Sequence, residues 1–73
     1  MMDVKIKELI AIGASVSANC HPCLKFHVSN ALENGVNDNE IQEAISVGKM
    51  VRKGAADEMD KLASAVVKDN KEL

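Results

Sequence analysis

The segment from Cys20 to His27 constrains the fold of this chain more than any other part of the sequence. It reads Cys-His-Pro-Cys-Leu-Lys-Phe-His and holds both cysteines, both histidines and the only proline. A proline is tolerated in the first turn of a helix but not in its interior, because it lacks a backbone N–H. Pro22 therefore predicts that one helix ends before this segment and that another begins within it.

Apolar residues recur at helical spacing through most of the chain, and no segment shows the alternation typical of a strand. The first helix is expected from about Asp3 to Asn19, with Asp3 as its N-cap and Gly13 suited to a close contact with another helix. The second is expected to begin at Asn19 or Cys20 and to end at Gly35, a residue that readily takes the left-handed conformation closing many helices.

Two further helices are expected after this turn. Asn37 and Glu40 resemble a capping box, so a third helix should start near residues 36–37. Gly54 is expected to break it. A last helix should then run from about Ala55 to Lys68, and the charged tail over residues 68–73 is expected to fray.

The expected fold class is all-α, with a single domain over residues 1–73 built as a small antiparallel bundle of three to four helices. With 73 residues, one Phe and no Trp or Tyr, the chain has no large aromatic anchor for its core. Val47 and Met50 also widen the apolar stripe of the third helix beyond one face. We therefore expect the bundle to be completed by oligomerisation.

Charge and hydropathy argue against two classes of partner. Nine basic residues are scattered among eleven acidic ones, whereas nucleic-acid binding requires clustered Lys and Arg. No apolar run approaches the length of a membrane span, and Lys5, Lys7 and Glu8 interrupt the apolar residues that a signal peptide would need. The protein is expected to be cytoplasmic, where paired cysteines are more often catalytic or metal-binding than structural.

The spacing of the chemically active side chains indicates thiol chemistry. Cys20 and Cys23 are close enough for one turn to bring their sulfurs within disulfide range, and a helix N-terminus favours the thiolate. His27 follows Cys23 by four residues, so both lie on one helix face and His27 could accept the thiol proton. A dithiol at this spacing supports reversible disulfide chemistry.

Two other interpretations of these residues stay open. Cys20, Cys23 and His27 could bind zinc with Glu8 or His21 as a fourth ligand, although structural zinc sites usually bring a second ligand pair. Alternatively, the cysteines could simply pack the start of a helix. Covalent haem is excluded, because its motif requires a histidine directly after the second cysteine. His21 itself is expected to be exposed.

The role expected for Glu8 depends on whether it is considered alone or together with the cysteine motif. Periodicity alone predicts a solvated side chain near Lys5. However, the pattern of Glu8, Cys20, Cys23 and His27 resembles the alkylhydroperoxidase D-like branch of the carboxymuconolactone decarboxylase family. That branch carries a Glu, eleven residues, Cys-x-x-Cys, three residues and a His, and every interval matches here. Residues 28–35 and 40–44 also resemble the family's helix, turn and helix.

The resemblance implies a helical domain that assembles into a trimer, a hexamer or a similar ring. It implies an enzyme that reduces hydroperoxides or disulfides through a Cys20/Cys23 dithiol–disulfide cycle, recharged by a dithiol donor and needing no cofactor. Cys23 would be the thiol activated by His27, and Glu8 the outer member of the proton relay.

One position departs from the family pattern. Peroxidase members often carry a histidine just before the second cysteine, where this chain has Pro22. The departure affects efficient peroxide turnover more than disulfide exchange, while hydroperoxide stays the leading expected oxidant. A lyase of the decarboxylase type is a further alternative, but such members typically lack the cysteine pair that this chain has.

Overall fold

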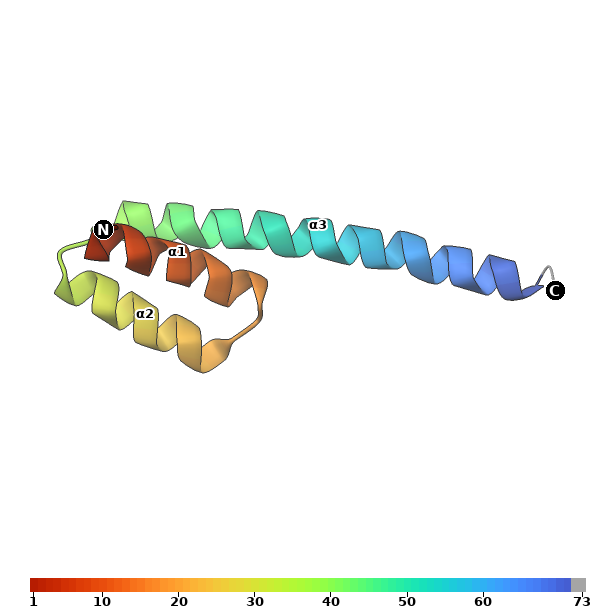
Figure 1. Cartoon of the computed structure of the whole chain (residues 1–73), viewed down its shortest axis with the longest axis horizontal. Helices are drawn as coiled ribbons and strands as arrows, with labels where there is room; N and C mark the ends of the chain where they lie inside the picture. The colour runs from red at the N-terminus through yellow and green to blue at the C-terminus, as the bar shows by residue number, and fades with distance from the viewer. Residues whose placement is uncertain (72–73) are drawn as a thin grey trace.

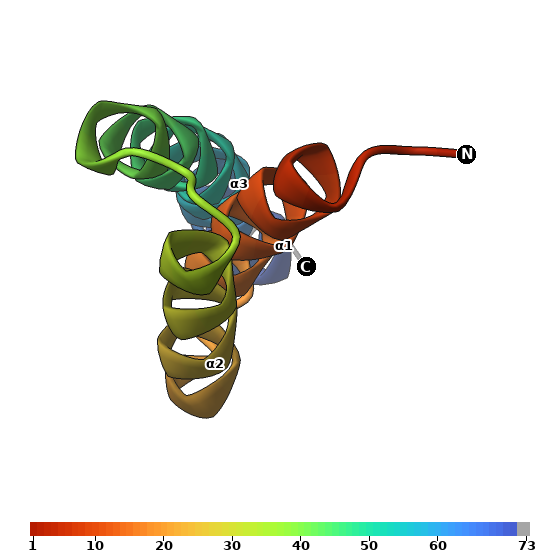
Figure 2. The same cartoon turned by 90° about the vertical axis from the view of Figure 1, so that its left-hand side faces the viewer.

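A computed structural model describes residues 1–71 as three α-helices joined by two short turns (Figure 1). The helices are α1 (Val4–Ser17), α2 (His21–Glu33) and α3 (Asp38–Lys71), and the described residues contain no strand. The predicted all-α class is confirmed. Helix α1 packs against both other helices, whereas α2 scarcely contacts α3. In Figure 1 the C-terminal half of α3 projects beyond the other two helices, and Figure 2 shows the bundle from the end at which α3 begins.

The helix starts form as their capping residues predict. The carboxylate of Asp3 accepts a hydrogen bond from the backbone N–H of Lys5 at 2.7 Å. The side-chain oxygen of Asn37 accepts one from the backbone N–H of Glu40 at 2.9 Å, as expected for that capping residue. Gly35 has a φ of 82°, the left-handed conformation that the sequence predicted at the end of α2.

The core lies where the N-terminal half of α3 meets α1 and α2. Its buried residues come from all three helices and from the turn between α2 and α3: Ile12, Ala31, Val36 and Ile41. Partly buried aliphatic residues surround them: Leu9, Leu24, Val28, Ala44 and Ile45. This small core has no aromatic residue, and the residues that α3 contributes to it all come from its first half.

The predicted break at Gly54 is wrong, because α3 runs through it without interruption. A glycine inside a helix costs only about 1 kcal/mol relative to alanine, and no proline follows to stop the helix. Lys53 and Asp57 also form an ion pair across this position at 2.8 Å. The helix extends through residues 68–71, which were expected to fray, while residues 72–73 lie outside the described part of the chain.

Two glycines allow α1 and α3 to approach closely. A Cβ placed on Gly48 would collide with the backbone oxygen of Gly13 and lie only 2.8 Å from the Cβ of Val16. A Cβ on Gly13 would lie 3.2 Å from the carbonyl oxygen of Ala44. The close contact expected at Gly13 is therefore present, and Gly48 supplies its other side.

Gly48→Ala should destabilise the protein, because the added methyl group meets backbone that cannot move away cheaply. We expect a loss of about 1–3 kcal/mol in the free energy of unfolding, measured by urea denaturation. Gly54→Ala is the matched control, since a Cβ added at that position would have nothing within 4 Å. That change should raise stability by about 0.5–1 kcal/mol through helix propensity. Equal effects of the two substitutions would contradict the close packing at Gly48.

Candidate functional site

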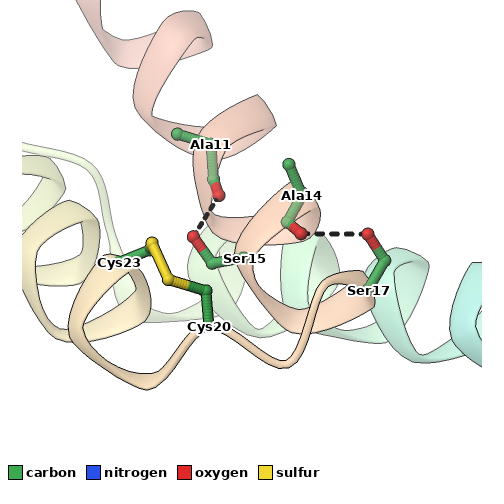
Figure 3. Close-up of a disulfide and its surroundings, with 6 residues drawn as sticks. All are labelled: Ala11, Ala14, Ser15, Ser17, Cys20 and Cys23. Carbon is green, nitrogen blue, oxygen red and sulfur yellow. Dashed lines mark hydrogen bonds between the residues drawn. A yellow bond between two sulfur atoms is a disulfide. The ribbon is translucent and has the colours of Figure 1, made fainter.

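The two cysteines form a disulfide at the N-terminal turn of α2 (Figure 3). Their Cα atoms are 5.3 Å apart, and both residues are half-buried. Cys20 is the N-cap of α2 and has extended backbone angles, while Pro22 occupies the first turn, as its chemistry predicts. The pair therefore lies where the free N–H groups of a helix favour a thiolate.

The turn that leads into the disulfide is fixed by hydrogen bonds. Asn19 has a φ of 55°, a left-handed conformation that asparagine tolerates better than most residues. The guanidinium of Arg52 on α3 donates to the side-chain oxygen of Asn19 at 3.0 Å and to the backbone oxygen of Val16 at 3.3 Å. The backbone N–H of Cys20 donates to the carbonyl oxygen of Ser15 at 2.9 Å. These contacts position Cys20 against the end of α1.

The hydroxyl groups of the two serines near this turn hydrogen-bond to backbone carbonyls of α1. The hydroxyl of buried Ser15 donates to the carbonyl oxygen of Ala11 at 2.6 Å, and that of Ser17 donates to Ala14 at 3.0 Å (Figure 3). Both hydroxyl protons are therefore directed at carbonyl oxygens of α1 and not at the cysteines.

A buried carboxylate supplies the second part of the site. Glu8 on α1 is only 8% exposed, and its Oε2 lies 2.7 Å from Nδ1 of His27 on α2. Its Oε1 accepts a hydrogen bond from the amide of Asn30 at 3.2 Å. The solvated Glu8 expected from periodicity is wrong, because α1 packs against α2 as well as α3 and a residue beside its main stripe is covered. The pairing of Glu8 with His27 follows the family pattern instead.

The hydrogen bond from His27 is the main cause that lowers the pKa of Glu8 below its ordinary value of 4.5. The hydrogen bond from Asn30 and the charge interaction with His27 act in the same direction, while burial opposes them. An ionised carboxylate can only accept hydrogen bonds, so Nδ1 of His27 is the donor. In a neutral imidazole, Nε2 is then the nitrogen left to accept a proton.

The structure brings the predicted site residues together in two pairs. Cys20 is bonded to Cys23, and Glu8 is hydrogen-bonded to His27. Cys23 and His27 lie one turn apart on α2, which links the two pairs. His21 is exposed, as expected.

Two residues that sequence reasoning missed complete the arrangement, namely Asn30 and Arg52. The three-residue step from His27 to Asn30 puts both on one helix face and is the signal that could have indicated Asn30. Arg52 left no such local signal, because its partners are 33 and 36 residues away.

The ligands that the zinc alternative requires are not gathered into a metal site. Within residues 1–71, no group of three or more His, Cys, Asp or Glu side chains is arranged to hold a metal ion. In the same part of the chain, no helix combines the length and the apolar character needed to cross a membrane.

These features define the class of this protein: a small all-α domain with a Cys-x-x-Cys disulfide at a helix N-terminus and a buried Glu–His pair one turn away. The chain belongs to the carboxymuconolactone decarboxylase family, whose sequence profile matches residues 2–67. This confirms the family that the spacing of the motif indicated.

A named relative comes from Paracoccus denitrificans and is described as "Uncharacterized protein 4 in cox locus". The two proteins are 36% identical over 55 residues, which cover 75% of this chain and 50% of the relative. The chain therefore spans about half the length of the curated relative that it matches. No solved structure gives a significant match.

Glu8→Gln tests the ionised state of the buried carboxyl. Because the folded pKa of Glu8 lies below 4.5, ionised Glu8 stabilises the fold above that pH, and this contribution is lost as the pH falls through the lowered pKa. Wild-type protein should therefore unfold at higher urea concentration than Glu8→Gln at neutral pH. The difference should shrink as the pH falls below 4.5 and through the lowered pKa of Glu8.

Glu33→Gln, which changes an exposed carboxyl on α2, is the control for this experiment. It should leave the urea midpoint nearly unchanged at neutral pH, since isolated surface charges contribute little to stability. A difference between wild type and Glu8→Gln that stays constant over the whole pH range would contradict an ionised Glu8 in the folded state.

Proposed function

We propose that this protein is a thiol-dependent oxidoreductase that reduces hydroperoxides or disulfides through a Cys20/Cys23 dithiol–disulfide cycle. The observation that carries the proposal is the buried Glu8–His27 hydrogen bond, one helical turn from a Cys-x-x-Cys disulfide. Membership of the carboxymuconolactone decarboxylase family supports it. The cysteine-containing branch that the motif resembles implies reduction of hydroperoxides.

The reaction needs both sulfurs. With a hydroperoxide, one thiolate attacks the distal oxygen, the O–O bond breaks, and an alcohol and a sulfenic acid form. The second thiolate attacks that sulfur and releases water, which closes the disulfide. With a disulfide, one thiolate forms a mixed disulfide and expels a thiolate, and the second cysteine then expels the other half. An external dithiol returns the protein to its reduced form by the reverse exchange.

His27 and Glu8 form the proton relay in this scheme. With Nδ1 donating to Glu8, His27 can accept the Cys23 proton at Nε2. The carboxylate then stabilises the imidazolium and holds the ring in place, and Asn30 holds the carboxylate. The proton later leaves with the alcohol or thiol product, so the relay ends each cycle as it began.

Cys23→Ser should abolish turnover, because no disulfide can close without the second sulfur. His27→Ala should retain a slow reaction, reduced roughly a hundredfold or more and rising with pH as hydroxide replaces the missing base. Ser29→Ala, an exposed change on the same helix, should keep full activity. The assay follows consumption of hydroperoxide or of a small disulfide by the reduced protein with excess dithiol.

Full turnover by the Cys23→Ser protein would refute the redox cycle. Retention of an activity by a protein with both cysteines changed to serine would instead support a lyase.

We further propose that the protein acts as a homo-oligomer, with a trimer or a hexamer as the expected assembly. The projecting half of α3 carries exposed apolar residues that no part of residues 1–71 covers: Met59, Leu62, Val66 and Val67. Met59, Leu62 and Val66 are spaced by three and four residues, which puts them on one face of the helix. A second helix with the same stripe would bury this face.

Leu62→Glu should dissociate the assembly, because a charge would enter the centre of the apolar stripe. Sedimentation equilibrium of the wild-type protein should give a multiple of the chain mass, and Leu62→Glu should shift it towards a single chain. Ser64→Glu adds the same charge on the opposite side of the helix and should leave the mass unchanged. A wild-type protein that sediments as a single chain would contradict this proposal.

A further inference from the structure

A hollow of about 390 Å³ opens beside the disulfide, between the start of α2 and the middle of α3. We call it the basic hollow. Cys20 is part of its wall, while Cys23 is not. Lys25 on α2 and Lys49 and Arg52 on α3 also line it, and Leu24 and Ile45 give it an apolar surface.

The charge of this hollow is one-sided. Among the described residues, no Asp or Glu lines it, although the whole chain carries a net charge of -2. The larger groove between α1 and α3, of about 560 Å³, shows the opposite pattern, with Glu40 and Glu43 in its lining and no Lys or Arg. Of these two hollows, the one beside Cys20 is therefore the one lined by cations.

These cations are also not neutralised by neighbours. Within residues 1–71, neither Lys25 nor Lys49 forms an ion pair, and both are exposed. Arg52 hydrogen-bonds only to uncharged oxygens, the carbonyl of Val16 and the amide of Asn19. Its bonds fix the position of the guanidinium but leave its positive charge uncompensated. A concave surface that is lined by positive charges and no negative ones raises the local concentration of anions.

We propose that the basic hollow binds the carboxylate-bearing arm of an aliphatic disulfide substrate and delivers the substrate's sulfur to Cys20. This inference rests on the proposed function and specifies its substrate class. The carboxylate faces Lys25, Lys49 and Arg52, while the methylene groups lie on Leu24 and Ile45. Specificity then comes from charge complementarity beside the attacking thiol.

The two cysteines supply both electrons that reduction of the substrate disulfide requires. The Cys20 thiolate attacks one sulfur of the substrate, the substrate S–S bond breaks, and one carboxylate-bearing thiolate leaves. The Cys23 thiolate then attacks Cys20, releases the second carboxylate-bearing thiolate and closes the Cys20–Cys23 disulfide seen in the structure. The substrate gains two electrons and the protein dithiol loses two.

The test compares three aliphatic disulfides of similar length whose ends differ in charge. Dithiodipropionate is anionic, bis(2-hydroxyethyl) disulfide is neutral and cystamine is cationic. The reduced 73-residue chain is mixed with each, and the rate of Cys20–Cys23 disulfide formation is followed by quenched mass analysis. Each rate is divided by the rate of dithiothreitol with the same disulfide, which removes differences in intrinsic reactivity.

The anionic disulfide should react about tenfold faster than the neutral one and faster still than the cationic one. This preference should shrink at high salt, because ions screen exposed charges. Lys25→Gln combined with Lys49→Gln should slow the anionic disulfide far more than the neutral one and so remove most of the preference. Lys61→Gln combined with Lys68→Gln removes the same charge from the projecting half of α3 and should leave the preference intact.

The possible failures are distinguishable. Equal normalised rates for all three disulfides would overturn this inference and leave the proposed redox cycle standing. An equal slowing of all three by the Lys25 and Lys49 changes would also overturn it, because the cations would then only activate the thiol. No reaction with any disulfide or with hydrogen peroxide would overturn the proposed function itself, and this inference with it.

Discussion

The hydrogen bond between Glu8 and His27 is the interaction on which the rest of this site depends. Helix α2 scarcely touches α3, so its position is set by α1, through the small aliphatic core and through this buried polar contact. Both groups are more costly to bury alone than together, because an unpaired carboxylate or imidazole inside a protein loses its hydration without compensation. The pair therefore fixes how α2 lies on α1, and it places the base that the proposed thiol chemistry needs.

The same scaffold determines where the proposed substrate would approach. Gly13 and Gly48 let α1 and α3 come together closely, and Arg52 on α3 reaches the turn before Cys20. The basic hollow lies between these elements, so helix packing, the orientation of the disulfide and the local charge are set by the same contacts. The apolar stripe on the projecting half of α3 is separate from the site and is available to a second chain.

Local features of the fold were predictable from sequence, whereas long-range contacts were not. The Asn37 cap depends only on residues within one helical turn, so it can be recognised from the sequence alone. The break predicted at Gly54 is wrong because a single glycine destabilises a helix only slightly, and the helix-forming residues around it outweigh that cost. The burial of Glu8 and the roles of Asn30 and Arg52 depend on contacts between residues 19 to 36 positions apart. Periodicity carries no information about such contacts, and only the family pattern indicated Glu8.

The most direct test of the central claim is the intact mass of the reduced, metal-free protein after one equivalent of hydrogen peroxide, followed over time and pH. The account predicts rapid loss of two hydrogens without added oxygen, which is the signature of a Cys20–Cys23 disulfide formed by an activated thiol. The pH dependence of that rate would report the ionisation that controls the thiol. A protein whose mass stays unchanged with peroxide and with small disulfides alike would contradict a redox role for the cysteine pair.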